Sequence, residues 1–195
     1  MHLFVYLHGF KSSPSSVKSQ LTKGAIETLI DQGHDLEWYG PQLPPSPQRA
    51  IEEVFAYINH RKFERLSVIG SSLGGYYATY LAEKYGEICR ATLLNPATEP
   101  ARDLEKYIGE QTSWHDADVF YFKKEYIQEL RDLYVSMITY PKRYQLLAAK
   151  DDEVLNWHEM VAKYPQTNQY ILERGGHAIS DYSEHLSKVL KFHLD

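Results

Sequence analysis

The stretch from Leu66 to Gly75, LSVIGSSLGG, constrains the fold of this chain more than any other. A short, mostly apolar run leads into a segment, Gly70 to Gly74, that matches the pattern G-x-S-x-G with Ser72 at its centre. Where this pattern joins a strand to a helix, the serine lies on a strained turn and its hydroxyl is exposed at the edge of the sheet. Glycine suits such a turn because the missing Cβ lets the chain bend sharply and lets the helix pack close to the strand. We therefore expect a strand, a turn that presents Ser72, and a helix.

The pattern is not sufficient by itself. Glycine and serine are common residues, so a chance match occurs in roughly one chain in fifteen of this length. An ordinary glycine–serine loop is the alternative interpretation. The rest of the chain decides between the two, because a reactive serine also requires a base and an acid further along.

Short apolar runs alternate with segments of helical periodicity along most of the chain. We expect strands at about 3–7, 35–39, 66–69, 91–94, 143–149 and 168–172, and helices at about 17–30, 47–58, 73–85, 157–164 and 181–194. Strands that alternate with helices pair in parallel, so the predicted fold is α/β, with about six mainly parallel strands and helices on both faces of the sheet. Ligands of such sheets bind at the carboxyl ends of the strands.

The segment from about 97 to 139 interrupts this alternation. It is long and rich in aromatic residues, and its clearest helix is predicted at 123–135. We expect it to form a helical cap within a single domain of residues 1–195. Its aromatic side chains either line a substrate pocket or pack helices onto the sheet. Tyr107 and Trp114 are the candidate pocket residues, and the side chains of Phe10 and Leu73 are candidates for the same wall.

Composition and charge exclude several classes of function. The 195 residues include 43% hydrophobic and 24% charged residues, and the net charge is −5 with no basic cluster, which argues against nucleic acid or an anionic membrane as partner. No apolar run is long enough to span a bilayer. The first residues lack the features of a secretory signal, and Cys89 is the only cysteine. We therefore expect a cytoplasmic protein, and the sequence leaves its oligomeric state open.

Three side chains follow predicted strands in the order serine, aspartate, histidine. Ser72 follows the third strand, Asp152 the fifth, and His177 the sixth, which is the chain order of an α/β-hydrolase triad. A serine hydroxyl is a weak nucleophile, so a histidine must accept its proton and a carboxylate must orient the imidazole. Asp151 and Glu153 are the alternatives for the acid. We favour Asp152, because Val154 is expected to anchor the loop in the core and leave Asp152 facing the histidine.

Two backbone amides are expected to form an oxyanion hole. The first is the N–H of Leu73, directly after the serine, and the second is the N–H of Phe10, in the loop after the first strand. His8 and Gly9 then shape that loop. The sequence has no H-x-x-x-H cluster of metal ligands, so we expect no metal site.

Four segments together resemble the small bacterial YqiA-type esterases of the α/β-hydrolase superfamily: YLHGFKSSP at 6–14, IGSSLGGYYA at 69–78, DEVL at 152–155 and GGH at 175–177. The resemblance covers nearly the whole chain. It implies a cytoplasmic, cofactor-free serine hydrolase that cleaves short acyl esters, or acyl-CoA thioesters, as small-molecule substrates. An acyltransferase or peptidase with the same triad and a catalytically silent binding protein are the alternatives.

Overall fold

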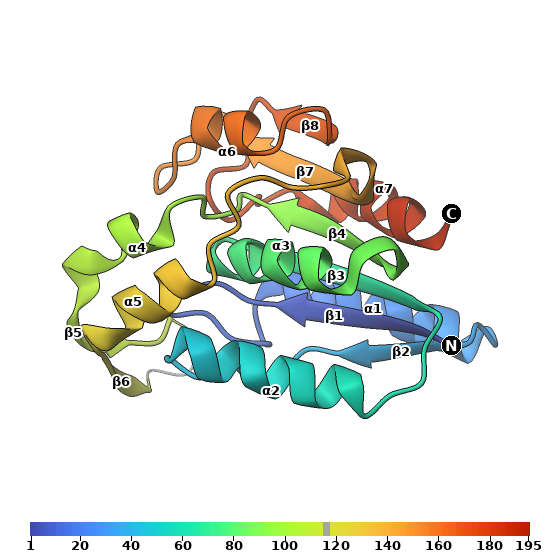
Figure 1. Ribbon diagram of the computed structural model, residues 1–195. Helices are drawn as coiled ribbons and strands as arrows, with labels where there is room; N and C mark the ends of the chain where they lie inside the picture. Colours follow the sequence, from blue (N-terminus) through green and yellow to red (C-terminus); the bar gives the residue numbers. More distant parts are fainter. Residues whose placement is uncertain (115–117) are drawn as a thin grey trace.

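The structure is a computed structural model that describes residues 1–114 and 118–195. Its main feature is a six-stranded sheet in which all neighbouring strands are parallel, in the order β2-β1-β3-β4-β7-β8 (Figure 1). These strands are β1 (His2–Leu7), β2 (Leu36–Tyr39), β3 (Arg65–Ser71), β4 (Cys89–Leu94), β7 (Tyr144–Ala149) and β8 (Asn168–Leu172). The predicted α/β fold with a six-stranded parallel sheet is therefore confirmed.

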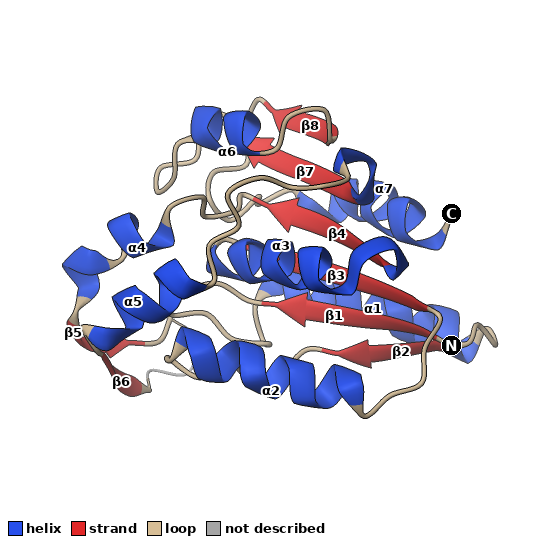
Figure 2. Cartoon of the chain, viewed as in Figure 1, coloured by secondary structure: helices blue, strands red, loops and turns tan. Residues whose placement is uncertain are grey.

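Helices cover both faces of this sheet (Figure 2). One face packs against α1 (Val17–Asp31) and α7 (Tyr182–Leu194), and the other against α2 (Pro47–Asn59), α3 (Leu73–Tyr85) and α6 (Trp157–Lys163). Alternate residues of β1 enter the two cores: Leu3, Val5 and Leu7 face α2 and α3, whereas Phe4 and Tyr6 face α1 and α7. Because both faces are buried, the strand is apolar from Leu3 to Leu7 instead of alternating with polar residues. No helix among the described residues has the length and apolar character that a membrane span requires.

The segment between β4 and β7 lies at the carboxyl ends of the parallel strands (Figure 1). It contains α4 (Pro100–Asp103), the antiparallel pair β5 (Gly109–Thr112) and β6 (Val119–Phe122), and α5 (Glu125–Asp132). Three short 3-10 helices complete the described elements: η1 (Gly86–Ile88), η2 (Glu105–Tyr107) and η3 (Pro141–Arg143). The helix expected at 123–135 is observed as α5. The hairpin was not expected, because strands of four residues are too short for their alternation to be recognised.

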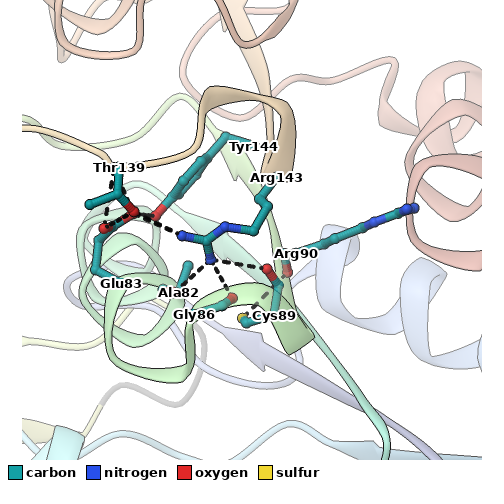
Figure 3. A network of polar contacts seen from close by, with 8 residues as sticks. All are labelled: Ala82, Glu83, Gly86, Cys89, Arg90, Thr139, Arg143 and Tyr144. Atoms are coloured by element: carbon teal, nitrogen blue, oxygen red, sulfur yellow. Dashed lines mark hydrogen bonds and ion pairs between the residues drawn. The ribbon is translucent and has the colours of Figure 1, made fainter.

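A polar network attaches the end of this segment to the core (Figure 3). The Arg143 guanidinium donates hydrogen bonds to the carbonyls of Ala82 and Gly86 at the end of α3, at 2.8 and 2.5 Å. It also donates to Thr139 Oγ1 and forms an ion pair with Glu83, and both charged side chains are largely buried. The cation thus adds a second hydrogen bond to Ala82 O, which also accepts the N–H of Gly86, and it complements the negative end of the helix dipole.

Replacing Arg143 is expected to lower the free energy of unfolding by about 3 kcal/mol, because Glu83 would keep its charge in a largely buried position without its partner. Urea unfolding of Arg143→Met measures this loss. The control is Arg49→Met, which removes an exposed ion pair with Glu53 and is expected to cost less than about 1 kcal/mol. Equal losses of unfolding free energy in the two variants would contradict the stabilising role of the Arg143–Glu83 pair.

Two buried histidines lie near the amino ends of the central strands. The imidazole of His2 is hydrogen-bonded to Ser67 Oγ at 2.7 Å, and that of His193 to Thr92 Oγ1 at 2.8 Å. Burial lowers the pKa of His2 to about 4, and the charge of Arg65 adds to this effect. Burial likewise lowers the pKa of His193 well below its usual range. Both rings are therefore neutral in the folded protein at neutral pH.

These histidines make the fold sensitive to acid. Below about pH 6.5 the histidines of the unfolded chain bind protons, whereas the buried rings of the folded protein do not. The free energy of unfolding is therefore unaffected by protonation of these histidines above that pH and decreases as the pH falls towards 4. His193→Gln is expected to flatten the dependence of unfolding free energy on pH between 6.5 and 5 by up to about 1 kcal/mol per pH unit. Urea titrations at several pH values measure the slope. His34→Gln, at an exposed histidine, is the control, and the same flattening in both variants would refute the explanation.

Candidate active site

Ser72 lies between the last residue of β3 and the first residue of α3, with φ 55° and ψ −120°. A positive φ is uncommon for a residue other than glycine and carries a cost of order 1–3 kcal/mol. Backbone hydrogen bonds hold the turn: the Ser72 N–H donates to Leu94 O at 3.0 Å, and Ser72 O accepts from the N–H groups of Gly75 and Ala97 at 2.9 and 3.0 Å. The strained turn that the motif predicts is thus present and supported by β4 and the loop that follows it.

The glycines around this turn allow a close approach of the backbones. A Cβ on Gly74 would lie 1.9 Å from the carbonyl oxygen of Leu7, and a Cβ on Gly70 would lie 2.2 Å from Gly74 O. A Cβ on Gly75 would lie 2.7 Å from the Cβ of Pro96. Any side chain at these positions would push α3 away from β3, from β1 or from the end of β4. The glycines therefore place the start of α3, and Ser72 with it, against the neighbouring strands.

The structure brings Ser72, His177 and Asp152 together. Ser72 Oγ lies 3.0 Å from His177 Nε2, and His177 Nδ1 lies 2.8 Å from Asp152 Oδ2. The side chain of Asp152 is fully buried, and its other oxygen accepts the backbone N–H groups of Val154 and Leu155, each at 2.8 Å. A carboxylate at this distance orients the Nδ1–H towards itself and leaves Nε2 free to accept a proton from the serine.

The two alternatives for the acid contact the histidine loop through its backbone instead. Asp151 accepts the N–H groups of Gly175 and Gly176 at 3.3 and 2.9 Å, and Glu153 accepts the N–H of His177 at 2.9 Å. Two carboxylates therefore hold three consecutive amides, whereas the imidazole itself is hydrogen-bonded to Asp152. The loop that precedes the histidine is fixed from its exposed side.

The expectation that Val154 anchors the acid loop in the core is wrong. Its side chain is 54% exposed. The loop is instead shaped by the Asp152 carboxylate, which accepts two of the amides that follow it. An aspartate readily forms such a turn with the backbone two residues on, and this local bonding replaces the hydrophobic anchor.

The loop after β1 runs beside Ser72. A Cβ on Gly9 would lie 3.0 Å from the Cβ of Ser72 and 3.3 Å from Ser71 O, so glycine lets this loop pass close to the serine. Phe10 follows directly. On the other side, the N–H of Leu73 belongs to the first residue of α3, where amides have no partner within the helix and carry partial positive charge. Both expected donors of an oxyanion hole therefore belong to segments adjacent to the serine.

His8 connects this loop to the segment before α2. Its Nδ1 lies 2.9 Å from Gly9 O, and its Nε2 lies 3.0 Å from the backbone nitrogen of Leu43. Nδ1 therefore carries the proton and donates, while Nε2 accepts from Leu43. The His8 ring thus connects the loop after β1 to the segment before α2 through hydrogen bonds to their backbones.

A cavity of about 670 Å³ adjoins the serine through Gly9 and Leu73. Its apolar lining includes the side chains of Phe10, Leu43, Leu73, Tyr77 and Phe120, from the loop after β1, the segment before α2, helix α3 and strand β6. The sequence pattern identified Phe10 and Leu73 as candidates and missed the other three. These three residues reach the cavity only because segments far apart in the sequence pack together. Phe120 nevertheless belongs to the aromatic segment that the sequence indicated.

Tyr107 and Trp114, the other two pocket candidates, do not line this cavity. The ring of Tyr107 packs against Phe10 with 5.6 Å between ring centroids, so it supports the wall from behind. Trp114 is 63% exposed, and its backbone N–H donates to Lys11 O at 2.9 Å. Trp114 therefore links the hairpin to the loop after β1 through its backbone, and the Lys11 ammonium lies over its indole, 5.9 Å from the ring centroid. Within residues 1–114 and 118–195, no group of three histidine, cysteine or acidic side chains could hold a metal ion.

Solved structures share this architecture. A protein of Agrobacterium vitis S4 matches with a TM-score of 0.75 at 17% identity, over 98% of this chain and 87% of that one. Alpha/beta hydrolase domain-containing protein 10 from mouse matches with a TM-score of 0.71 at 13% identity, over 97% and 89% of the two chains. Est1E from Butyrivibrio proteoclasticus, in a structure with bound ferulic acid, matches with a TM-score of 0.72 at 13% identity, over 100% and 90%. The sheet order, the strained turn and these likenesses define an α/β-hydrolase fold.

The sequence also matches a family model over residues 3–194, nearly its full length. The chain belongs to the uncharacterised protein family UPF0227.

Proposed function

We propose that this protein is a serine hydrolase that cleaves carboxylic esters or thioesters through Ser72, His177 and Asp152. One observation carries the proposal: two successive hydrogen bonds, of 3.0 and 2.8 Å, connect the serine hydroxyl to the imidazole and the imidazole to a buried carboxylate. Structural neighbours that include the esterase Pf2001 of Pyrococcus furiosus and a metagenome-derived lipolytic enzyme support the same class of reaction.

The reaction proceeds in two halves. His177 Nε2 accepts the hydroxyl proton as Ser72 Oγ attacks the acyl carbon, and the N–H groups of Leu73 and Phe10 stabilise the negative oxygen of the tetrahedral intermediate. The imidazolium then gives its proton to the departing alcohol or thiol, which leaves an acyl-enzyme. Water attacks that ester with His177 again as base, and the acid product and free serine are released. Asp152 keeps the imidazole oriented and stabilises its charged form throughout.

The cavity beside the serine accommodates the acyl group. Its volume of about 670 Å³ lies within the range of small-molecule sites, and its apolar side chains can contact an aliphatic or aromatic acyl chain, while Lys11, Glu53 and Asp118 also line it. Short acyl esters and acyl-CoA thioesters, which the sequence resemblance implies, are the substrates we propose. The acyl-enzyme needs no cofactor, and water is the acceptor.

A panel of chromogenic esters, matched thioesters and a peptide anilide tests the substrate class. We expect hydrolysis of the esters and thioesters, with kcat/KM rising as the acyl chain lengthens to fill the cavity, and little cleavage of the anilide. Preferential cleavage of the anilide, or acyl transfer to an added alcohol in place of water, would identify a peptidase or acyltransferase instead. Absence of turnover on the whole panel would favour a binding protein.

A further inference from the structure

Asn95 directly follows β4 and is completely buried. Its backbone φ is 42°, in the left-handed region that asparagine tolerates better than most residues other than glycine. A buried amide has to satisfy its donors and its acceptor, because each one left without a partner costs about 1–3 kcal/mol. Asn95 therefore has an unusual backbone conformation, and its side chain requires hydrogen-bond partners within the protein.

Those partners belong to the segments that carry the histidine and the acid. Asn95 Nδ2 donates to the carbonyl oxygens of Gly176 and His177, at 2.9 and 3.1 Å. Asn95 Oδ1 accepts the N–H of Ala149, at the end of β7, at 2.8 Å. One carboxamide thus connects the loop of His177 to the strand from which the loop of Asp152 departs.

The backbone around Asn95 also contacts the serine. Leu94 O accepts the N–H of Ser72, and the N–H of Ala97 donates to Ser72 O, both at 3.0 Å. The N–H of Asn95 itself donates to Leu147 O at 2.8 Å. The residue therefore lies where the segments of all three triad members meet.

The other contacts to the histidine loop are of a different kind. Asp151 and Glu153 hold its amides from the exposed side, where water competes for the same hydrogen bonds. Lys18 Nζ donates to Ala178 O at 2.6 Å, one residue beyond the histidine. Asn95 alone among these four side chains is fully buried, so water competes less for its hydrogen bonds.

We infer that Asn95 is a positioning residue that fixes the main chain of His177 so that its Nε2 stays within hydrogen-bond distance of Ser72 Oγ. The inference rests on the proposed function. The imidazole has to serve both the serine and the leaving group, and a displacement of about 1 Å can reduce the rate by about 100-fold. Because Asn95 does not line the cavity, it should affect the rate of reaction rather than substrate binding.

Two substitutions test the role. Asn95→Asp keeps the size and the acceptor but places an oxygen opposite the carbonyls of Gly176 and His177, and Asn95→Gly keeps the backbone conformation but removes all three side-chain hydrogen bonds. The measurements are the second-order rate constant of labelling by a fluorophosphonate, per folded molecule, and kcat and KM for an ester. We expect the labelling rate and kcat to fall about 10- to 100-fold and KM to change less than about twofold.

Gln145→Glu is the matched control. Gln145 is another buried amide, at the opposite end of β7, which accepts from Thr92 Oγ1 at 3.0 Å and donates to Lys188 O at 3.3 Å. Its replacement should lower the melting temperature while the folded molecules label at the wild-type rate. Loss of stability is thereby separated from loss of alignment.

The outcomes are distinct. Asn95 variants that melt at a lower temperature but label at the wild-type rate per folded molecule would overturn the inference and leave only a structural role. Labelling of the wild-type protein at Ser72, with slow labelling of both folded variants, would support it. A wild-type protein that is not labelled at all would overturn the proposed function and the inference with it.

Discussion

Ser72→Ala is expected to reduce ester hydrolysis by at least about 10⁴-fold, since the nucleophile is lost while the fold is retained. The substitution removes one oxygen from a side chain whose backbone hydrogen bonds to Leu94, Gly75 and Ala97 remain. The melting temperature should therefore change little. Steady-state hydrolysis of a chromogenic ester, compared with thermal unfolding of the same preparation, measures both effects.

The adjacent serine provides the control for this experiment. Ser71 is the last residue of β3 and is buried, and the Oγ that lies beside His177 Nε2 belongs to Ser72. Ser71→Ala should therefore retain most of the activity. If Ser72→Ala remained active, or if Ser71→Ala lost activity to the same extent, the assignment of the nucleophile would be wrong.

Asp152→Asn is expected to lower kcat by about 10³- to 10⁴-fold. The amide that replaces Oδ2 would donate towards Nδ1 of His177, which favours the tautomer with its proton on Nε2. That tautomer cannot accept the proton of Ser72. The same substitution also weakens the turn that Asp152 Oδ1 makes with the amides of Val154 and Leu155, so circular dichroism and the melting temperature should accompany the kinetics.

Variants of the two neighbouring acids distinguish the specific role of Asp152 from a general effect of negative charge in this loop. Asp151→Asn and Glu153→Gln each remove one negative charge but alter contacts only to backbone amides of the histidine loop. We expect each to cost less than about tenfold in kcat, because an amide oxygen still accepts a hydrogen bond from those N–H groups. If Asp152→Asn kept full activity while Asp151→Asn or Glu153→Gln lost it, the acid of the triad would be the other residue and not Asp152.

The sequence was most informative where a local pattern has a single structural solution. Gly70 and Gly74 are required because a Cβ on either would collide with a neighbouring backbone, so the motif around Ser72 predicts a turn of this shape. The order of Ser72, Asp152 and His177 also predicts their convergence, since each follows a strand of one parallel sheet. The continuous apolar runs also predict buried strands, because both faces of this sheet are covered by helices.

The features that the sequence did not reveal depend on contacts between distant segments. Nothing local to Asn95 indicates that its carboxamide reaches residues 176 and 177. Val154 was expected to be buried because it is apolar, yet the hydrogen bonds of the preceding aspartate determine the course of that loop. The cavity wall combines Leu43, Tyr77 and Phe120 from three elements, so its composition follows from the tertiary structure alone.

The central claim is that Ser72 is a nucleophile activated by His177. Labelling with a fluorophosphonate, followed by mass spectrometry of the digested protein, tests this claim most directly. We predict one adduct per chain, located on Ser72, that is absent in Ser72→Ala and forms far more slowly in His177→Ala. An adduct on Ser71 or another residue, an equal labelling rate without His177, or no adduct on the folded wild-type protein would contradict it.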